Sequence, residues 1–252
     1  MALLGCKPVS AGSPEATAPA AATSEHHWGY LGPGAPEHWG ELSAEFATCQ
    51  TGQFQSPIDL TPIAKADVDA LTISYKPDEL RILNNGHTVQ INHKADSTLS
   101  LVGHEFRLLQ YHVHSPSEHT ESGTHHALEM HLVHQDDAGN YAVIAVFFDE
   151  GPDDGPDAVW QHLPERADGI EHDYVGEQVD PSELLPESLV HYQYHGSLTT
   201  PPCTETVTWN VLQTPVTVSA ERIAHFRELY AANARPVQPR PDWCLAPHKI
   251  GS

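Results

Sequence analysis

Apolar residues in this chain occur in short runs, and the length of these runs restricts how the chain can fold. The longest strongly apolar run, residues 141–148, has eight residues, whereas a helix that spans a bilayer needs about 20. A run of this length is typical of a buried strand. Similar runs recur with turn residues between them, and the chain holds 21 prolines, which interrupt helices. The sequence therefore predicts a fold dominated by a β-sheet.

Alternation of apolar and polar residues places the predicted elements. An Asn84-Asn85-Gly86 turn precedes the first strand. The predicted strands are residues 88–93, 99–102, 105–114, 127–135, 141–149, 207–212 and 215–218. One predicted helix spans about residues 156–163, and a second follows an N-cap at Ser219. Many short strands with scattered helices indicate one α+β domain, which we place at residues 25–240.

The two ends of the chain differ from this domain. Residues 7–24 contain six Ala, three Pro, three Ser and two Thr, which is the composition of a linker. Residues 3–6, Leu-Leu-Gly-Cys, resemble the end of a bacterial lipoprotein signal, although a chance match is the alternative. We therefore expect residues 1–24 to be a truncated export signal with a linker, and residues 241–252 to be a C-terminal tail.

The charge of the chain excludes two classes of partner. Twelve basic and 34 acidic residues give a net charge of −22. Nucleic acids and anionic lipid surfaces would repel such a polyanion, so neither is expected as a partner. The acidic surface serves solubility or adaptation to salt, and the sequence leaves both explanations open.

Histidines point to metal chemistry. The chain has 19, of which seven lie within the 23 residues 112–134. His112 and His114 are two apart on a predicted strand and so share one face, while His131 lies on the next predicted strand. Three neutral imidazoles that meet at one point would leave an open fourth position on Zn²⁺, which is the catalytic pattern. Gln110 and Glu129 each lie two residues before one of these histidines, where they are placed to orient it.

At this point several separated motifs, in order, resemble the α-class carbonic anhydrases. The resemblance covers about residues 27–239 and implies a central, mostly antiparallel, twisted sheet of about ten strands with short surface helices. It also implies a zinc site in a conical cleft. The motifs are residues 27–30, 55–58, 84–87, 110–114, 117–120, 129–134, 185–188, 194–202, 207–209 and 235–236.

The resemblance implies zinc-dependent, reversible hydration of carbon dioxide to bicarbonate and a proton, with ester hydrolysis as a side activity. One zinc ion per chain would be held by His112, His114 and His131. The groups that orient these ligands would be Gln110, Glu129 and the backbone carbonyl of Asn233.

Further roles follow from the same resemblance. Thr199 would accept a hydrogen bond from zinc-bound hydroxide and donate its own to Glu118, and Thr200 would lie in the bicarbonate site. His87 would be the proton shuttle, with His26 and His27 as alternatives. The apolar wall for carbon dioxide would comprise Val133, Val143, Leu198, Val207 and Trp209. The residues that hold ordered water would be Tyr30, Asn85 and Gln90, the last at a position where animal cytosolic members usually carry Asn.

The four cysteines, Cys6, Cys49, Cys203 and Cys244, form no CxxC motif, so a thiolate zinc site is not expected. Cys49 and Cys203 match the disulfide positions of secreted and bacterial family members. A disulfide implies an oxidising compartment, so we expect a periplasmic or cell-surface protein, lipid-anchored if Cys6 is acylated. Cys244 is left free, intermolecular or paired with Cys6, and bacterial relatives suggest a homodimer.

Two other functions stay open from the sequence. The first is an inert surface-binding module on the same fold, and the second is a periplasmic zinc-binding protein that uses the surplus histidines. Zinc content measured together with carbon dioxide hydration would separate all three.

Overall fold

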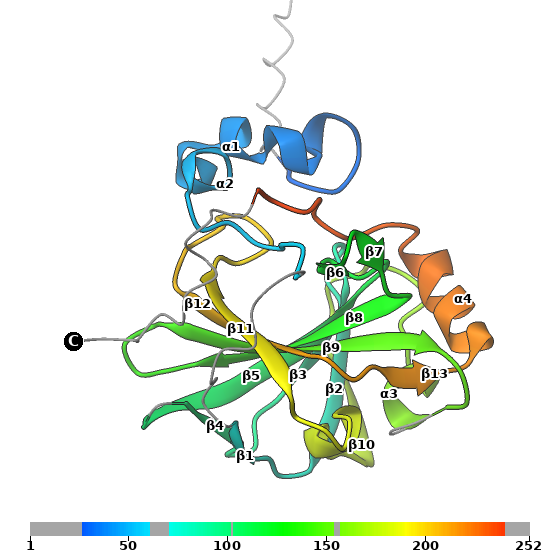
Figure 1. Cartoon of the computed structure of the whole chain (residues 1–252). Helices are drawn as coiled ribbons and strands as arrows, with labels where there is room; N and C mark the ends of the chain where they lie inside the picture. Colours follow the sequence, from blue (N-terminus) through cyan, green and yellow to red (C-terminus); the bar gives the residue numbers. More distant parts are fainter. Residues whose placement is uncertain (1–26, 61–70, 102, 154–156, 240–252) are drawn as a thin grey trace, which may run out of the picture.

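One large sheet organises the chain. The computed structural model describes residues 27–60, 71–101, 103–153 and 157–239, and within them 11 strands form one sheet (Figure 1). The order is β10-β2-β3-β5-β8-β9-β12-β11, while β4 extends from β5, β1 from β4 and β13 from β9. The strands are β1 Thr72–Ser74, β2 Asp78–Asn84, β3 Val89–Asn92, β4 Thr98–Leu101, β5 His104–His114, β8 Leu128–Gln135, β9 Tyr141–Glu150, β10 His172–Val179, β11 His191–Gly196, β12 Val207–Leu212 and β13 Val216–Val218.

Antiparallel pairing dominates this sheet, and the only parallel pairs among the described strands are β9 with β12 and β9 with β13. A separate hairpin joins β6 Thr120–Glu121 to β7 Thr124–His125. The helices are short: α1 Trp39–Leu42, α2 Thr48–Thr51, α3 Asp157–Gln161 and α4 Ala220–Leu229, with 3-10 turns at Gly32–Gly34, Pro36–His38, Ala44–Phe46 and Pro181–Leu184. The predicted α+β, sheet-dominated fold class is confirmed.

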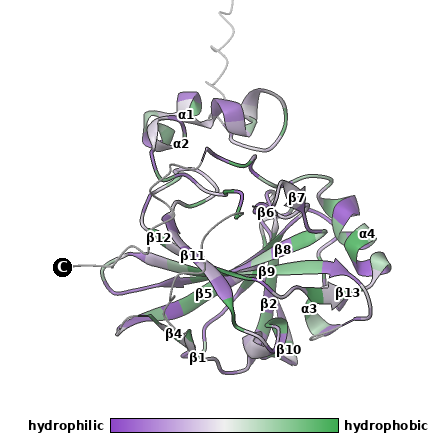
Figure 2. Cartoon of the chain, in the orientation of Figure 1, coloured by the Kyte–Doolittle hydropathy of each residue, from purple (hydrophilic) through white to green (hydrophobic). Residues whose placement is uncertain are grey.

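The middle of the sheet is buried on both faces. Seven of the eight residues of β8 are buried, and Figure 2 shows hydrophobic residues along β8 and β9. Met130 and Leu132 enter the main core, which α4 covers with Ile223 and Phe226. Val133 faces the other way into a second cluster, on the same face as His131. The sheet therefore separates the main core from the face that carries the histidines.

The strands and helices that we predicted from strong patterns are present, with shifts of one or two residues at their ends. Ser219 caps α4 as expected, because its side chain accepts a hydrogen bond from the Arg222 backbone N–H. The sequence did not predict β1, β2, β10 and β11, nor the short N-terminal helices. β10 is largely exposed and β11 carries many polar residues, so neither has a strong apolar pattern.

Other expectations meet the structure only in part. No helix in the described segments is long and apolar enough to span a membrane. Cys6, Cys244, His26 and both terminal segments lie outside the described residues, so the boundaries of the domain, at residues 25 and 240, stay predictions.

A disulfide ties the N-terminal helices to the rest of the chain. Cys49 on α2 is bonded to Cys203, 154 residues further on, as predicted. The bond packs with Trp39 in a small cluster of its own, which Trp28, Tyr30 and other apolar residues border. Figure 1 shows α1 and α2 together at one end of the molecule, outside the sheet. This disulfide is therefore a covalent link between that lobe and the loop between β11 and β12, which contains Thr199.

Removing this disulfide should destabilise the protein. In the chain-entropy model a loop of this length contributes up to about 5 kcal/mol, because the crosslink restricts the unfolded chain. A Cys49→Ala/Cys203→Ala variant should therefore unfold at a lower urea concentration than the wild type. Dithiothreitol should lower the urea midpoint of the wild type but not that of the variant. A free Cys49 thiol in peptide maps of the non-reduced protein would contradict the pairing.

His134 should make stability depend on pH. It is fully buried on β8, where its Nδ1–H donates to the Ala142 carbonyl and Nε2 accepts from the Tyr75 hydroxyl. Burial lowers the pKa of His134 from 6.5 to about 4. Between these values the unfolded chain binds a proton that the folded protein excludes, so this contribution to stability is complete above pH 6.5 and is lost as the pH falls towards 4.

The loss is at most about 3 kcal/mol. Urea unfolding at pH 7 and pH 4.5, with metal chelated, should therefore show a smaller acid destabilisation for His134→Gln than for the wild type. Equal losses in the two proteins would contradict the assignment.

Candidate active site

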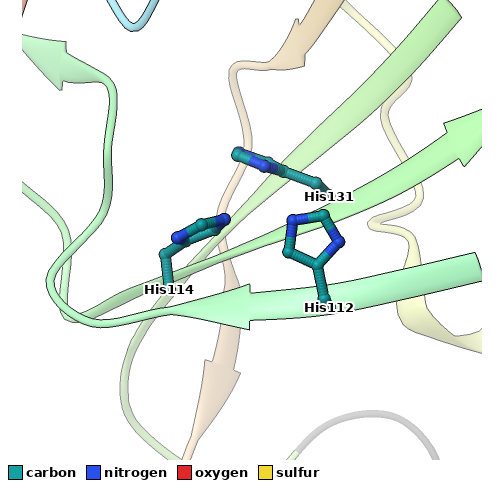
Figure 3. Close-up of side chains that lie close together, drawn as sticks. All are labelled: His112, His114 and His131. Carbon is teal, nitrogen blue, oxygen red and sulfur yellow. The ribbon is translucent and has the colours of Figure 1, made fainter. Parts of the chain in front are cut away.

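Three histidines meet on one face of the sheet. His112 and His114 belong to β5, and His131 belongs to β8, where it lies directly opposite His112 in the register. One ring nitrogen from each lies within 4.8 Å of those of the other two. Figure 3 shows the rings converging from two neighbouring strands. The period of two along β5 and the β5–β8 register are therefore sufficient to assemble the triad.

Each ring is held by a hydrogen bond through its other nitrogen. His112 Nδ1 donates to Gln110 Oε1 (2.9 Å), and His131 Nε2 donates to Glu129 Oε1 (2.8 Å). His114 Nδ1 donates to the backbone carbonyl of Asn233 (2.7 Å). These bonds fix the ring orientations and leave His112 Nε2, His114 Nε2 and His131 Nδ1 for a ligand.

The charge state of the triad fits a metal. Burial lowers the pKa of His114 and, helped by the two neighbouring histidines, holds that of His112 well below its ordinary value. These rings are therefore neutral near pH 7, which is the form that binds metal. His114 Nε2 is buried without a hydrogen-bond partner in the described part of the chain. An unpaired buried nitrogen in a set of three imidazoles, two of which burial holds neutral, fits Zn²⁺.

Glu129 is hydrogen-bonded to His119 as well as to His131. His119 was not singled out from the sequence. Glu129 accepts hydrogen bonds from the backbone N–H (2.8 Å) and Nδ1 (2.6 Å) of His119 as well as from His131. Burial alone would raise the pKa of Glu129, but the two histidines outweigh it and hold that pKa well below its ordinary value. One possible ligand atom each from His119, Glu129 and His131 also lies within 4.8 Å of the other two. Because hydrogen bonds already engage both Glu129 oxygens, we interpret this group as support for the triad.

Glu118 lies beside this centre, and both Glu118 and Thr199 are buried. Glu118 Oε1 accepts the backbone N–H of Arg235 (2.8 Å), and Glu118 Oε2 lies 3.9 Å from His131 Nδ1. Within the described residues Oε2 has no hydrogen-bond partner, so the expected bond from the Thr199 hydroxyl is not formed to this oxygen. The loop around Thr199 is closed by backbone bonds, one of which joins the Cys203 N–H to the Thr200 carbonyl.

Apolar residues border the triad on one side. Val133, Val143, Val207 and Trp209 belong to one buried cluster, and Leu198 packs against it. The Trp209 ring centroid is 4.8 Å from that of His131. The structure thus brings together all five residues expected to form an apolar wall, beside the histidine at the centre of the site.

Polar residues lie on strands and loops next to the triad. Gln90 is opposite His112 in the β3–β5 register and accepts a hydrogen bond from Asn85 Nδ2 (3.3 Å). Tyr30 lies in the N-terminal lobe, and its pKa is raised well above the ordinary value by burial and then by the charge of Glu118. Asn85 and Gln90 therefore touch one another, while Tyr30 approaches from a separate part of the chain.

His87 is stacked between aromatic rings. Its ring lies flat on Trp28 (centroids 3.6 Å apart) and 5.1 Å from the ring of His27. Burial, followed by the nearby His27, lowers the pKa of His87 to about 4. Sequence reasoning placed His87 and His27 in the same region but did not foresee the stack on Trp28, because no periodicity links a turn to an N-terminal segment.

Replacing His131 by Ala should remove the metal. The variant loses one of three protein ligands, so its zinc affinity should fall by more than the roughly 10- to 100-fold that loss of an outer partner such as Gln110 costs. Competition with a chelator measures this affinity. His104→Ala is the matched control, since His104 is exposed on the same strand, β5, and should leave zinc binding unchanged. Full zinc affinity in His131→Ala would exclude the triad as the site.

Comparisons with known proteins agree with this geometry. The family model for eukaryotic-type carbonic anhydrase matches residues 34–241. The chain is 44% identical over 222 residues to a carbonic anhydrase of Pectobacterium carotovorum (87% of this chain, 90% of the relative) and 41% identical over 232 residues to one of Nostoc sp. (90% and 87%). A solved α-carbonic anhydrase of Thermovibrio ammonificans, in complex with the inhibitor sulfanilamide, superposes with a TM-score of 0.80 at 42% identity (84% of this chain, 95% of that one). The chain therefore belongs to the carbonic anhydrase family, as the sequence motifs indicated.

Proposed function

We propose that this chain catalyses the zinc-dependent, reversible hydration of carbon dioxide to bicarbonate and a proton. The observation that carries the proposal is the set of three oriented histidines, two of them held neutral by burial, beside an apolar wall and a buried carboxylate. Zinc bound by His112, His114 and His131 would lower the pKa of water from 15.7 to about 7, an effect for which carbonic anhydrases are the standard example, and so supply a nucleophile at neutral pH.

The apolar wall suits the substrate. Carbon dioxide has no net charge or dipole, so contact with Val143, Val207 and Trp209 costs it little solvation and displaces water from the site. Thr200 is half-buried and follows Leu198 of this wall by two residues, so its hydroxyl would bind the more polar bicarbonate. The difference in polarity between substrate and product then favours release of bicarbonate.

Glu118 and Thr199 would orient the attacking oxygen. The Arg235 N–H fixes Glu118 Oε1, and Oε2 is available to accept the Thr199 hydroxyl proton. A Thr199 hydroxyl that donates to Glu118 presents its oxygen lone pairs to the site. It can then only accept a hydrogen bond there, which directs the reactive lone pair of the attacking oxygen at carbon dioxide.

A proton must leave the site in every cycle. Transfer to bulk water at the diffusion limit allows only about 10³ s⁻¹, whereas this family reaches about 10⁶ s⁻¹. We infer that His87 relays the proton. The pKa of His87 is about 4 in the stacked position, so proton transfer to its ring from a donor of pKa 7 is uphill by about 4 kcal/mol. A barrier of this height alone still permits a transfer rate of about 10⁹ s⁻¹. The low pKa then favours rapid transfer onward to His27 or to buffer.

The compartment and the remaining partners are proposals too. The Cys49–Cys203 disulfide supports an oxidising environment, so we propose export to the periplasm or cell surface. A lipid anchor at Cys6 and a homodimer stay predictions from the sequence.

Zinc content and carbon dioxide hydration, measured on the same sample, test the function. We expect about one zinc ion per chain, hydration that a chelator abolishes and recovery when zinc is restored. Zinc without hydration would favour an inert module, and several zinc ions per chain would favour a zinc-binding protein.

His87→Ala should slow turnover in dilute buffer by up to the roughly 10³-fold gap between shuttled and bulk transfer. The interconversion of carbon dioxide and bicarbonate at equilibrium should barely change, since the shuttle acts after it, and added imidazole should restore turnover. His125→Ala, an exposed histidine on β7, is the control. Unchanged turnover in dilute buffer would move the shuttle elsewhere, with His27 and His26 the next residues to replace.

A further inference from the structure

Residues 233–235 contact three parts of the candidate active site. The Asn233 carbonyl accepts the His114 N–H, and Asn233 Nδ2 donates to the His87 carbonyl (3.0 Å). Two residues later, the Arg235 N–H donates to Glu118 Oε1 (2.8 Å). A short stretch that follows α4 is therefore bonded to a metal ligand, to the backbone of the shuttle residue and to the carboxylate that orients Thr199.

The Arg235 side chain anchors this stretch. It is only 2% exposed, and it donates to the carbonyls of Ser56 (2.8 Å) and Cys49 (2.9 Å) while its guanidinium lies 5.5 Å from the centre of the Trp39 ring. Within the described residues no carboxylate accepts a hydrogen bond from the guanidinium, and its Nε is buried without a partner. Burial lowers the pKa of Arg235 to about 10, with the charge of Glu118 acting against this, so the group is still cationic at neutral pH.

A buried cation without a bonded anion is a poor source of stability. Transfer of a charge from water into the interior costs several kcal/mol, and two carbonyl bonds and an aromatic face repay only part of this. An apolar side chain would fill the same space at lower cost. The advantage of the guanidinium is that its planar set of N–H groups can donate to the Cys49 and Ser56 carbonyls at the same time.

We propose that Arg235 is a positioning residue for Glu118. Any residue except proline at this place offers the N–H that Glu118 accepts, so the need for arginine lies in where its anchored side chain holds that N–H. The inference rests on the proposed function, in which Glu118 orients Thr199. Through its bond to the Cys49 carbonyl, Arg235 also connects Glu118 to the disulfide in the loop that contains Thr199.

The anchor acts on Glu118 through geometry. Oε1 receives the Arg235 N–H, and Oε2 must face Thr199 for the hydroxyl to be oriented. If the 233–235 stretch drifts, the carboxylate rotates and this alignment is lost. Misplacement of a catalytic group by about 1 Å can cost about 10²-fold in rate, whereas the ligands on β5 and β8 would hold zinc as before.

A double-mutant cycle between Arg235→Lys and Glu118→Gln tests this role in the zinc-loaded protein. Lysine keeps the charge but cannot donate to both carbonyls as a fork. Alone, Arg235→Lys should lower kcat/KM for carbon dioxide hydration by about 10-fold, at a temperature well below unfolding and with one zinc ion retained. In the Glu118→Gln background it should lower kcat/KM by less than 2-fold, because residues that act as a unit are not additive.

Stability separates positioning from a merely structural role. The drop in melting temperature caused by Arg235→Lys should be equal in both backgrounds, whereas the loss of activity should appear in one only. Equal losses of kcat/KM in both backgrounds, or a loss that follows zinc content, would overturn the inference. Arg222→Lys is the control, since Arg222 pairs with Asp153 and Asp157 on the α3–α4 side, and should not change kcat/KM.

Trp39→Phe provides a second variant if Arg235→Lys does not fold. It shrinks the aromatic face under the guanidinium and removes the Trp39 Nε1–H bonds to the Gly29 and Gly34 carbonyls, but the bonds from Arg235 to the Ser56 and Cys49 carbonyls can still form, so a smaller loss with the same non-additivity is expected. Additive losses here would equally overturn the inference. Absence of hydration in the zinc-loaded wild type would instead refute the proposed function.

Discussion

The antiparallel register between β5 and β8 is the constraint on which the site depends. It places His112 opposite His131 and His114 opposite Glu129, so that all three histidines and the carboxylate that supports His131 come from two rungs of one ladder, with the Val113–Met130 rung between them. A slip of one residue would turn the β8 histidine into the main core and bring Met130 or Leu132 to the site. The apolar face of β8, packed in one core with α4, resists such a slip, so the hydrophobic core holds the three histidines in register.

The groups that orient the three histidines lie at different distances from them along the chain. Gln110 and Glu129 act on neighbours in their own strands, and the carbonyl that orients His114 lies 119 residues away. The first two contacts follow from strand geometry alone, whereas the third exists only when the chain after α4 is docked. The triad is thus partly a local property of the sheet and partly a property of the whole fold.

The sequence predicted the parts of this structure that follow from periodicity. Alternation along residues 105–114 put His112 and His114 on one face, and residues 127–135 supplied the partner strand. The edge strand β10 was missed because it is mostly exposed and has no apolar rhythm. Asn233 and the Cys49–Cys203 pair came only from the family resemblance, and the contacts of His119 and Arg235 were not foreseen, because tertiary packing and not spacing brings them to the site.

The late position of Asn233 and Arg235 in the sequence has a consequence for biosynthesis. A chain that emerges from its N-terminus presents all three histidines when little more than half of it has been made, yet the carbonyl that fixes His114 and the N–H that fixes Glu118 arrive about a hundred residues later. The three histidines therefore exist on the growing chain before the two hydrogen bonds that orient His114 and Glu118 can form. Completion of the site geometry is accordingly a late event, reached only when the final stretch docks.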